Sequence, residues 1–545
     1  MLLILPTALV FTAAVLNYAR GPYWISYNSD PEYLYLLSSL SLAESKQVET
    51  TKNPGTTIQI LGAATLKIAH ALDFSEKNNL EFDVLKSPEF YLTVINVVLV
   101  TFNTLMLFIV GWTAFSLTKN IWLSLLLQLS PFLSITTLNY SLCHVSPEPF
   151  LLFSSLLFSL ILVKMAFSKD LSKSAHWYMI ALALVSGFGV ATKFTFAPLL
   201  IIPLMILPKL RNKICFLVLT VLSFVLWTWP IISRYEILFD WCYSVLTHVG
   251  YYGEGSPGII SPVVYLQNIL FLLGIDPLFF LIGGFATVVI IMLGWSFVGG
   301  DKAARKALRQ DISFRILMAV TVAQLCAVLI IAKHPADRYL LPVLNFSGLM
   351  LFLIFIYLRR IDYLNRLNLK KAVLFAGIFL VFLSALRIND IKNMFIQKLQ
   401  IKQATLAVHR KMETGYKDYL KVYFVFISSS PISALAFGNY FIANGVYSEA
   451  LQKIYGEANF YNLFNGKFQT WNGEFSIEDV ILKGHGSKVV FLCPPLVKYG
   501  DKIACSTGSI LYLRDVLKGR YETIYALDGI QIMWGEKFQP IQPSP

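Results

Sequence analysis

The stretch Trp24-Ile-Ser-Tyr-Asn-Ser-Asp30-Pro31-Glu32-Tyr33 follows the first apolar segment of the chain, and the rest of the sequence is arranged around it. It places two carboxylates, Asp30 and Glu32, where an apolar run of nearly membrane-spanning length gives way to polar residues. A second stretch, Lys52-Asn53-Pro54-Gly55-Thr56, adds a cation to the same loop. Charged side chains at the edge of hydrocarbon cost free energy, so their presence there indicates a functional site.

The composition predicts a polytopic membrane protein. Of the 545 residues, 56% are hydrophobic and 14% are charged, and the mean hydropathy is +0.62. These values are far from the balance of a soluble globular domain. The net charge of +13 comes from basic residues in short loops between apolar runs, which fits membrane topology and not a nucleic-acid partner. The run 1–19 lacks a basic region and a convincing cleavage site, so it is predicted to be a retained first span and not a signal peptide.

About eleven apolar runs are long enough to cross, or nearly cross, a hydrocarbon core that is about 30 Å thick. The two runs that meet near Lys193 are short and contain Gly187, Gly189 and Pro198, which predicts tilted or broken helices there. The runs cover residues 2–19, 90–117, 121–138, 150–167, 177–191, 194–207, 214–232, 278–298, 312–332, 339–358 and 372–386.

Four basic loops between these runs predict the orientation of the chain. They would all be cytoplasmic if the N-terminus is cytoplasmic, as the positive-inside rule requires. The first outer loop, the segments before Glu148 and around His248, the loop 333–338 and the whole tail would then share the extracytoplasmic face. The basic loops lie at residues 164–173, 209–213, 302–309 and 359–371.

The first outer loop and the tail have predicted structures of their own. Apolar residues between Leu34 and Ala71 recur at helical spacing but are interrupted by polar residues, which predicts two juxtamembrane helices. After an amphipathic connector over 387–421, the run 422–427 predicts a buried strand. The predicted fold class is therefore an all-α polytopic membrane domain, residues 1–386, with a small extracytoplasmic α/β domain, residues 422–545. Of the six cysteines, only the tail pair Cys493 and Cys505 is predicted to be able to form a disulfide, in an oxidising compartment.

Three acidic residues at predicted helix starts are candidates for catalysis. Asp30 and Glu32 also fit a plain helix start, with Asp at the N-cap and Pro at the first helical position. That structural role does not exclude a catalytic one. Glu148 follows Pro147 at the start of another span and repeats the pattern on the same face. Its alternative role is that of a first-turn acid favoured by the helix dipole.

Four cations on the predicted outer face are candidates for binding a phosphate. Lys333 and Arg338 lie in one short outer loop, where the positive-inside rule disfavours cations, and the planar Arg fork suits phosphate. Snorkelling towards lipid headgroups is the alternative. Lys52 and Lys193 are the further candidates for the same anion site.

The loop 241–257 carries candidates for sugar binding. Its glycines allow close approach of the backbone to a ligand, and His248 and Tyr252 offer stacking and hydrogen bonds. Tyr339, next to Arg338, is a third candidate. The sequence shows no metal-ligand spacing, nucleotide-binding loop or Ser-His-Asp pattern, so an ATP-driven pump is not predicted. A divalent ion is compatible with the chemistry but not indicated by it.

The order of these motifs resembles the polytopic GT-C glycosyltransferases related to protein O-mannosyltransferases and to the aminoarabinose transferases that modify lipid A. The resemblance covers roughly residues 1–386. The sequence departs from the commoner family forms at Asn53, where His or Pro is frequent, and at Pro31, which separates two acids that are often adjacent. The matching segments are 30–32, 52–55, 147–148, 187–193, 248–253 and 333–342.

The resemblance implies a transferase that moves a sugar from a polyprenyl-phosphate donor to an acceptor hydroxyl on lipid A or its core, another glycan or a protein. Asp30 is the expected base, and the cations are expected to stabilise the departing phosphate, with inversion at the anomeric carbon. The expected location is a bacterial inner membrane, with a cytoplasmic N-terminus and a periplasmic tail. A secondary transporter and an assembly scaffold for cell-envelope glycans are the alternatives, although the two related halves typical of transporters are not visible.

Overall fold

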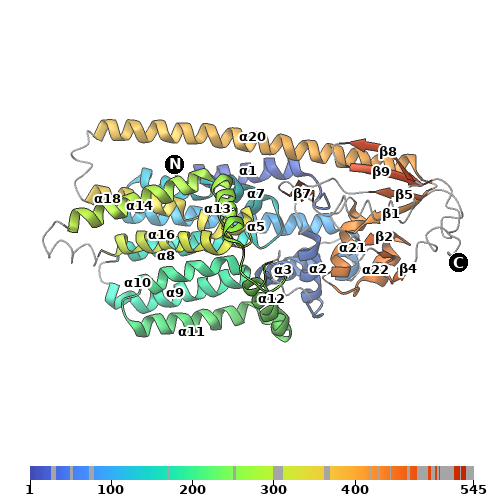
Figure 1. Cartoon of the computed structure of the whole chain (residues 1–545), viewed down its shortest axis with the longest axis horizontal. Coiled ribbons are helices and arrows are strands. Elements are labelled where there is room, and N and C mark those ends of the chain that lie inside the picture. Colours follow the sequence, from blue (N-terminus) through green and yellow to red (C-terminus); the bar gives the residue numbers. More distant parts are fainter. Residues whose placement is uncertain are drawn as a thin grey trace. The chain divides into compact units, whose positions relative to one another are not determined.

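The computed structural model is mostly helical, with a small mixed sheet formed by the C-terminal part of the chain (Figure 1). It describes residues 1–25, 32–48, 53–72, 79–168, 171–249, 253, 255–298, 311–360, 369–417, 419–425, 430–441, 443–462, 467–475, 489–492, 498–499, 502–503, 521–527 and 530–535.

The chain divides into two compact units. The first comprises Met1–Asn17, Thr51–Ile58 and Asn96–Met394, and the second comprises Tyr18–Thr50, Gln59–Ile95 and Phe395–Pro545. Each unit is thus assembled from segments far apart in the sequence. Four helices contribute residues to both units: α1 (Ile4–Arg20), α3 (Thr56–Leu72), α5 (Pro88–Thr118) and α20 (Leu369–Gly415).

Most helices of the first unit are apolar and long. Among the described residues, six helices are long and apolar enough to cross a membrane, or seven if α13 (Pro262–Ile275) and α14 (Pro277–Val298), which meet at a bend of 100°, form one broken span. These helices indicate an integral membrane protein. The six are α5, α8 (Glu148–Ala166), α9 (Leu171–Thr192), α11 (Leu210–Trp227), α16 (Ile312–Ile331) and the segment Asp337–Ile356, which contains η5 (Asp337–Leu340), α17 (Leu341–Leu344) and the first part of α18 (Ser347–Arg360).

Two of the expected spans are interrupted at proline. The run 121–138 is divided among α6 (Ile121–Gln128), η1 (Ser130–Leu133) and α7 (Ile135–Cys143), because Pro131 begins a new turn and cannot continue the hydrogen bonding of α6. The run 194–207 consists of η2 (Phe194–Leu200) followed by α10 (Ile201–Ile206), with Pro198 inside the 3-10 segment. This agrees with the broken helix predicted near Lys193.

Helix α13 was not predicted from the sequence, which places the start of the neighbouring span at residue 278. Its apolar run is interrupted by polar residues, and these attach the helix to α16. Tyr265 donates a hydrogen bond to the carbonyl of Leu329 (2.6 Å), and Asn268 donates to the carbonyl of Ala332 (2.8 Å). The polar residues that interrupt the apolar run, and so prevented its prediction as a helix, are the residues that bind α13 to its neighbour.

The second unit contains a seven-stranded mixed sheet in the order β4-β3-β2-β1-β5-β9-β8. Strand β1 (Leu420–Phe424) is parallel to both of its neighbours, with Val422 opposite Asn459 on one side and Phe491 on the other. The remaining pairs are antiparallel, and β6 (Lys498–Tyr499) and β7 (Lys502–Ile503) form a separate small sheet. The other strands are β2 (Asn459–Asn462), β3 (Lys467–Gln469), β4 (Glu474–Phe475), β5 (Val489–Leu492), β8 (Tyr521–Leu527) and β9 (Ile530–Gly535).

Helices from the first outer loop pack against the C-terminal domain inside this unit. Both helices predicted between residues 34 and 71 are present, as α2 (Glu32–Ala43) and α3. Helix α21 (Pro431–Phe441) lies close to α2 at Gly438, where a Cβ atom would come within 2.8 Å of Leu37 Cδ1 and 3.1 Å of Tyr33 O. Tyr455, at the end of α22 (Ser448–Tyr455), donates to the carbonyl of Leu85 in α4 (Leu80–Lys86), at 2.8 Å.

Helix α20 joins the expected last span and the expected connector in one helix of 47 residues. No proline interrupts it, and it ends at Gly415, a residue that favours helix termination. In the second unit, Lys402 donates to the carbonyl of Tyr18 (2.8 Å), and the rings of Trp24 and His409 lie 5.2 Å apart. The C-terminal half of α20 therefore contacts the last turn of α1 and the chain segment that follows it.

Candidate functional site

Three helices begin at the same short pattern, in which a polar residue is followed by Pro-Glu. It occurs at Asp30-Pro31-Glu32, Ser87-Pro88-Glu89 and Ser146-Pro147-Glu148. Proline suits the first turn because its missing N–H has no helical partner, and a glutamate there is favoured by the helix dipole. Helices α2, α5 and α8 begin there. The three glutamates share this position at a helix start, but each of them contacts different polar partners.

Glu148 contacts a lysine that was predicted to lie at the outer end of a neighbouring span. The Oε1 atom of Glu148 lies 2.5 Å from Nζ of Lys193, which directly follows α9. The two residues are only 4% and 3% exposed. Arg338, 5% exposed, lies within electrostatic range of the same carboxylate. The structure thus gathers Glu148, Lys193 and Arg338 in one buried cluster of the first unit.

The ring of Tyr339 lies against both cations of this cluster. Its centroid is 5.1 Å from Nζ of Lys193 and 5.8 Å from Cζ of Arg338, distances that allow cation–π attraction. The preceding Asp337 accepts hydrogen bonds at Oδ1 from the backbone N–H of Arg338 (2.7 Å) and from the hydroxyl of Tyr140 (3.2 Å). These contacts fix the short η5 turn from which Arg338 and Tyr339 extend.

The segment that follows Lys52 contacts the residues on both sides of Lys193. The side-chain oxygen of Asn53 accepts the backbone N–H of Phe194 (3.2 Å), and the hydroxyls of Thr57 and Thr192 are 2.9 Å apart. Asn53 has a φ of +59° and Gly55 a φ of +62°, left-handed values that Asn and Gly adopt most readily. Two motifs far apart in the sequence, 52–55 and 187–193, therefore meet at the end of α9.

Lys333 contacts a different element. Its Nζ donates to the carbonyls of Val245 (2.8 Å) and Leu246 (2.5 Å) at the end of α12 (Tyr235–Thr247), and Nε2 of His334 lies 3.3 Å from the Val245 oxygen. The last carbonyls of a helix have no helical partner, so Lys333 satisfies them. Burial lowers the pKa of Lys333; burial, together with the charge of Lys333, lowers the pKa of His334.

His248 lies at the same helix end, directly after α12. Its Nδ1 is 2.9 Å from the hydroxyl of Thr247, and its backbone pairs with Pro257 in an isolated bridge. The structure therefore brings His248 close to the residues that Lys333 and His334 contact. The two cations of the predicted outer loop 333–338 have different partners: Lys333 contacts α12, and Arg338 lies in the Glu148 cluster.

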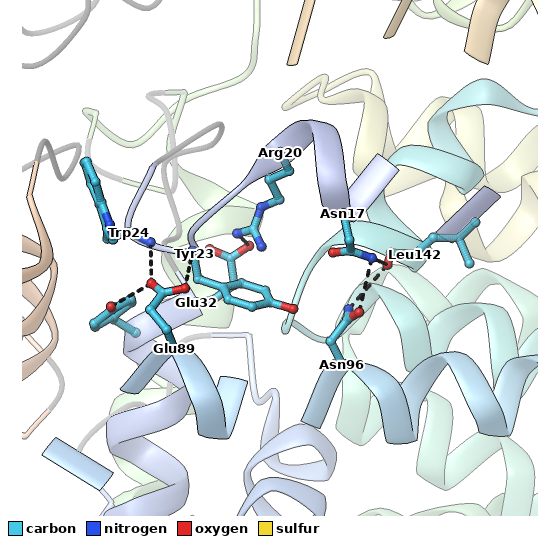
Figure 2. Close-up of polar contacts among 9 residues, drawn as sticks. Asn17, Arg20, Tyr23, Trp24, Glu32, Glu89, Asn96 and Leu142 are labelled. Atoms are coloured by element: carbon cyan, nitrogen blue, oxygen red, sulfur yellow. Dashed lines mark hydrogen bonds and ion pairs between the residues drawn. The ribbon is translucent and has the colours of Figure 1, made fainter. Parts of the chain in front are cut away.

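Glu32, in the second unit, forms a buried ion pair with Arg20 (Figure 2). The two residues are 2% and 1% exposed, and the Arg20 guanidinium lies 4.0 Å from the ring centroid of Tyr23. The carboxylate is thus held by the last residue of α1. This contact supports the structural interpretation of Glu32 as the first acid of its helix.

Glu89 was missed in the sequence analysis. Its Oε2 accepts the backbone N–H of Tyr23 (2.7 Å), and its Oε1 accepts the backbone N–H of Trp24 (3.0 Å) and the hydroxyl of Tyr33 (2.8 Å) (Figure 2). Burial raises the pKa of Tyr33 well above its ordinary value, and the negative charge of Glu89 adds to this effect. The available signal was the Pro-Glu pattern, which occurs at 88–89 as it does at 31–32 and 147–148.

Figure 2 also shows a separate polar contact in the first unit, between α1, α5 and α7. Asn17 donates from Nδ2 to the carbonyl of Leu142 (2.9 Å) and to Oδ1 of Asn96 (3.3 Å), and Asn96 donates to the same carbonyl (3.3 Å). Leu142 lies near the end of α7, shortly before the turn that leads into Glu148. This contact holds the end of α7 against α1 and α5.

Several predicted site residues lie outside the described residues, namely Asp30, Lys52 and Tyr252, and so do Cys493 and Cys505. Their predicted roles therefore remain predictions. Within the part of the chain that the structure describes, no group of three or more His, Cys, Asp or Glu side chains is arranged to hold a metal ion.

Comparisons with known proteins add a likeness to solved structures. No protein-family model matches the chain, and no curated protein matches it significantly. The chain is similar to the crystal structure of ArnT from Cupriavidus metallidurans bound to undecaprenyl phosphate, with 12% sequence identity, coverage of 97% of both chains and a TM-score of 0.46. An identity and a TM-score this low give no basis for transferring fold or function, so the function has to be inferred from this chain's own residues.

Proposed function

We propose that this protein is a membrane glycosyltransferase that moves a sugar from a polyprenyl-phosphate donor to an acceptor hydroxyl on the extracytoplasmic face. The observation that carries this proposal is the buried cluster of Glu148, Lys193 and Arg338, in which two cations share one carboxylate. Glu148 and Arg338 lie at the beginnings of two helices of membrane-spanning length. A lipid-linked phosphate lies at the same depth, where hydrocarbon meets water.

The donor groups of the cluster suit a phosphate. Lysine and arginine are cationic donors that carry no acceptor, so both side chains suit an anionic phosphate. The Arg fork matches phosphate oxygens geometrically. The ring of Tyr339, which lies against both cations, restricts where they can point. These features favour binding of one phosphate at a fixed position. They fit less well with snorkelling, in which the cations reach towards many lipid headgroups.

In the proposed reaction Asp30 takes the proton of the acceptor hydroxyl while its oxygen attacks the anomeric carbon of the donor sugar. The bond between that carbon and the phosphate oxygen breaks, and polyprenyl phosphate leaves with the bonding electrons, which inverts the anomeric centre. Lys193 and Arg338 stabilise the charge that builds on the departing phosphate, and Lys52 is assigned to the same anion.

The other predicted site residues receive different roles in this proposal. Glu148 holds Lys193 in position beside the phosphate, and we assign the base to Asp30 and not to Glu32 because the Glu32 carboxylate contacts Arg20. His248 and Tyr252 are assigned to the sugar. Lys333 is assigned a positioning role, since its ammonium group contacts the end of α12.

The test is transfer of labelled sugar from a polyprenyl-phosphate donor by the purified protein in lipid vesicles, with cell-envelope lipid, glycan and protein fractions as acceptors. We expect transfer by the wild type and none by Asp30→Asn. Glu44→Gln, which changes an exposed acid in the same loop, is the matched control and should retain transfer. Full activity of Asp30→Asn would remove Asp30 as the base. Movement of the donor across the vesicle membrane without transfer would favour the transporter, and neither activity would favour the scaffold.

A further inference from the structure

The described residues on the two sides of the Asp30 segment are bonded to one carboxylate. Tyr23 and Trp24 follow α1 and offer their backbone N–H groups to Glu89, while Tyr33, in the first turn of α2, offers its hydroxyl. Figure 2 shows the side chain of Glu89 reaching from the start of α5 to the backbone of Tyr23 and Trp24. One side chain on a third helix therefore joins the segment after α1 to the beginning of α2.

The chemistry of this contact requires a carboxylate. An ionised carboxylate is acceptor-only and can take three donors on two oxygens, whereas a glutamine has one acceptor oxygen and adds two donors. Tyr23, Trp24 and Tyr33 are 5%, 4% and 0% exposed, so groups that lose these bonds would not regain them from water. Charge-assisted bonds of this kind are stronger than those between neutral groups.

Two further contacts hold the same pair of segments. Arg20 and Glu32 form their buried ion pair across the same two segments, and the carbonyl of Tyr33 lies against Gly438 of α21. The beginning of α2 is thus held from the α1 side, from α5 and from the C-terminal domain, all within the second unit.

We propose that Glu89 is a positioning residue of the first outer loop: it joins the segment after α1 to the first turn of α2 and so fixes the two described ends on either side of the Asp30 segment. A reacting group that is misplaced by about 1 Å can lose roughly a hundredfold in rate. Glu89 touches no reacting atom in this proposal and acts through the chain segments that it joins. The effect on turnover rests on the proposed function, because it presupposes that an acid of this loop acts on the acceptor.

The experiment compares Tyr33→Phe and Glu89→Gln with the wild type. Tyr33→Phe removes one of the bonds to Glu89 and should lower kcat roughly tenfold, less than the hundredfold that full misplacement of a reacting group can cost, without a change in the KM for the donor. Glu89→Gln disturbs all three bonds and should lower kcat further. Thr93→Val is the matched control. The Thr93 hydroxyl donates to the backbone carbonyl of Glu89 (2.7 Å) on the exposed side of the same helix, so its loss should leave kcat unchanged.

Hydrogen exchange provides a second measurement that does not depend on activity. In both loop variants, peptides that cover residues 20–25 and 32–36 should exchange faster, while peptides from α8 should exchange as in the wild type. Unchanged exchange at these segments would overturn the positioning role. Faster exchange with an unchanged kcat would also overturn it, since the contact would then be structural only. If the wild type transfers no sugar from any donor, the proposed function fails, and the exchange data alone decide whether Glu89 joins the two segments.

Discussion

Two ion pairs among the described residues are almost completely buried, Glu148 with Lys193 and Glu32 with Arg20. Both glutamates come from the same Pro-Glu pattern, but their surroundings differ. In the second unit, the Arg20 guanidinium contacts the Glu32 carboxylate, lies on the ring of Tyr23 and is within electrostatic range of a second carboxylate, Glu89. In the first unit, the carboxylate of Glu148 is shared between Lys193 and a second cation, Arg338. Both pairs are almost completely buried, so burial alone does not distinguish them.

The difference between the pairs is one of charge. In the second unit two carboxylates, Glu32 and Glu89, act on one guanidinium, whereas in the first unit two cations act on one carboxylate, an arrangement that favours a further anion. We therefore expect the Arg20 pair to matter for folding and the Lys193 cluster to matter for folding and donor binding together. Variants of Lys193, Glu32 and Arg338 separate the effect on folding from the effect on donor binding.

The largest effect is expected from Lys193→Met. The variant leaves the Glu148 carboxylate buried without its nearest cation, which should lower the free energy of unfolding by about 3–5 kcal/mol. It also removes a cation from the leaving phosphate, so transfer should fall by roughly a hundredfold or more. Thermal unfolding in detergent and the transfer assay measure the two effects.

The double variant Lys193→Met with Glu148→Leu is the control for this prediction. Replacing a buried ion pair by apolar residues of similar size often restores stability, so the melting temperature should recover while donor binding should not. Recovery of transfer along with stability would show that the pair is structural and that the phosphate binds elsewhere.

The next effect is expected from Glu32→Gln, which breaks the other pair while the Arg20 guanidinium stays buried. Unfolding should again become easier by about 3–5 kcal/mol, but the affinity of the folded protein for labelled polyprenyl phosphate should not change. Binding measured below the melting temperature of the variant tests this point. A donor affinity that drops together with stability would remove the distinction between the two pairs.

A smaller effect, confined to donor use, is expected from Arg338→Gln. Loss of a hydrogen bond to a charged group costs about 1.5–3 kcal/mol, so the KM for the donor should rise roughly 10- to 100-fold. Stability should change less than in Lys193→Met, because Glu148 keeps its contact with Lys193.

The matched control for Arg338 is Arg315→Gln. Arg315 donates to the carbonyls of Met205 and Ile206 at the end of α10, both at 2.9 Å, so its loss should affect stability without affecting the donor. Equal effects of the two arginine variants on donor KM would argue against a phosphate at Arg338.

The smallest effect is expected at Glu413 and Lys421, an ion pair (2.7 Å) whose carboxylate side chain is 41% exposed. Burial opposes ionisation of Glu413, but the contact with Lys421 outweighs it and lowers the pKa below the ordinary 4.5. Because the folded pKa lies below the unfolded one, the pair stabilises the protein above pH 4.5, and this stability is lost as the pH falls through the folded value. Solvent screening keeps the contribution below about 1 kcal/mol.

Melting temperatures between about pH 3 and pH 7 test this prediction. Glu413→Gln should flatten the decline on the acid side slightly and leave the neutral region almost unchanged. A loss of stability as large as that of Glu32→Gln would mean that burial is not what separates the strong pairs from the weak one.

The sequence by itself determined several of the helices and where they start. Apolar runs marked α8 and α16, prolines marked the broken run after Lys193, and the strand expected at 422–427 overlaps β1 at Leu420–Phe424. These features depend on a residue and its near neighbours: hydrocarbon length, a missing N–H at proline and the periodicity of apolar side chains. The residues of the Glu148 cluster could also be singled out from the sequence, because charged residues beside apolar runs are few.

Only the tertiary structure decided which partner each charge takes. Glu148 meets a lysine 45 residues away, Asn53 accepts a bond from a backbone N–H 141 residues away, and Lys333 contacts the end of α12 instead of the Glu148 cluster. Glu89, overlooked in the sequence, joins two segments more than 50 residues before it. Local propensity cannot make these choices, because a buried charge is stabilised by whichever distant group the packing of helices brings within reach.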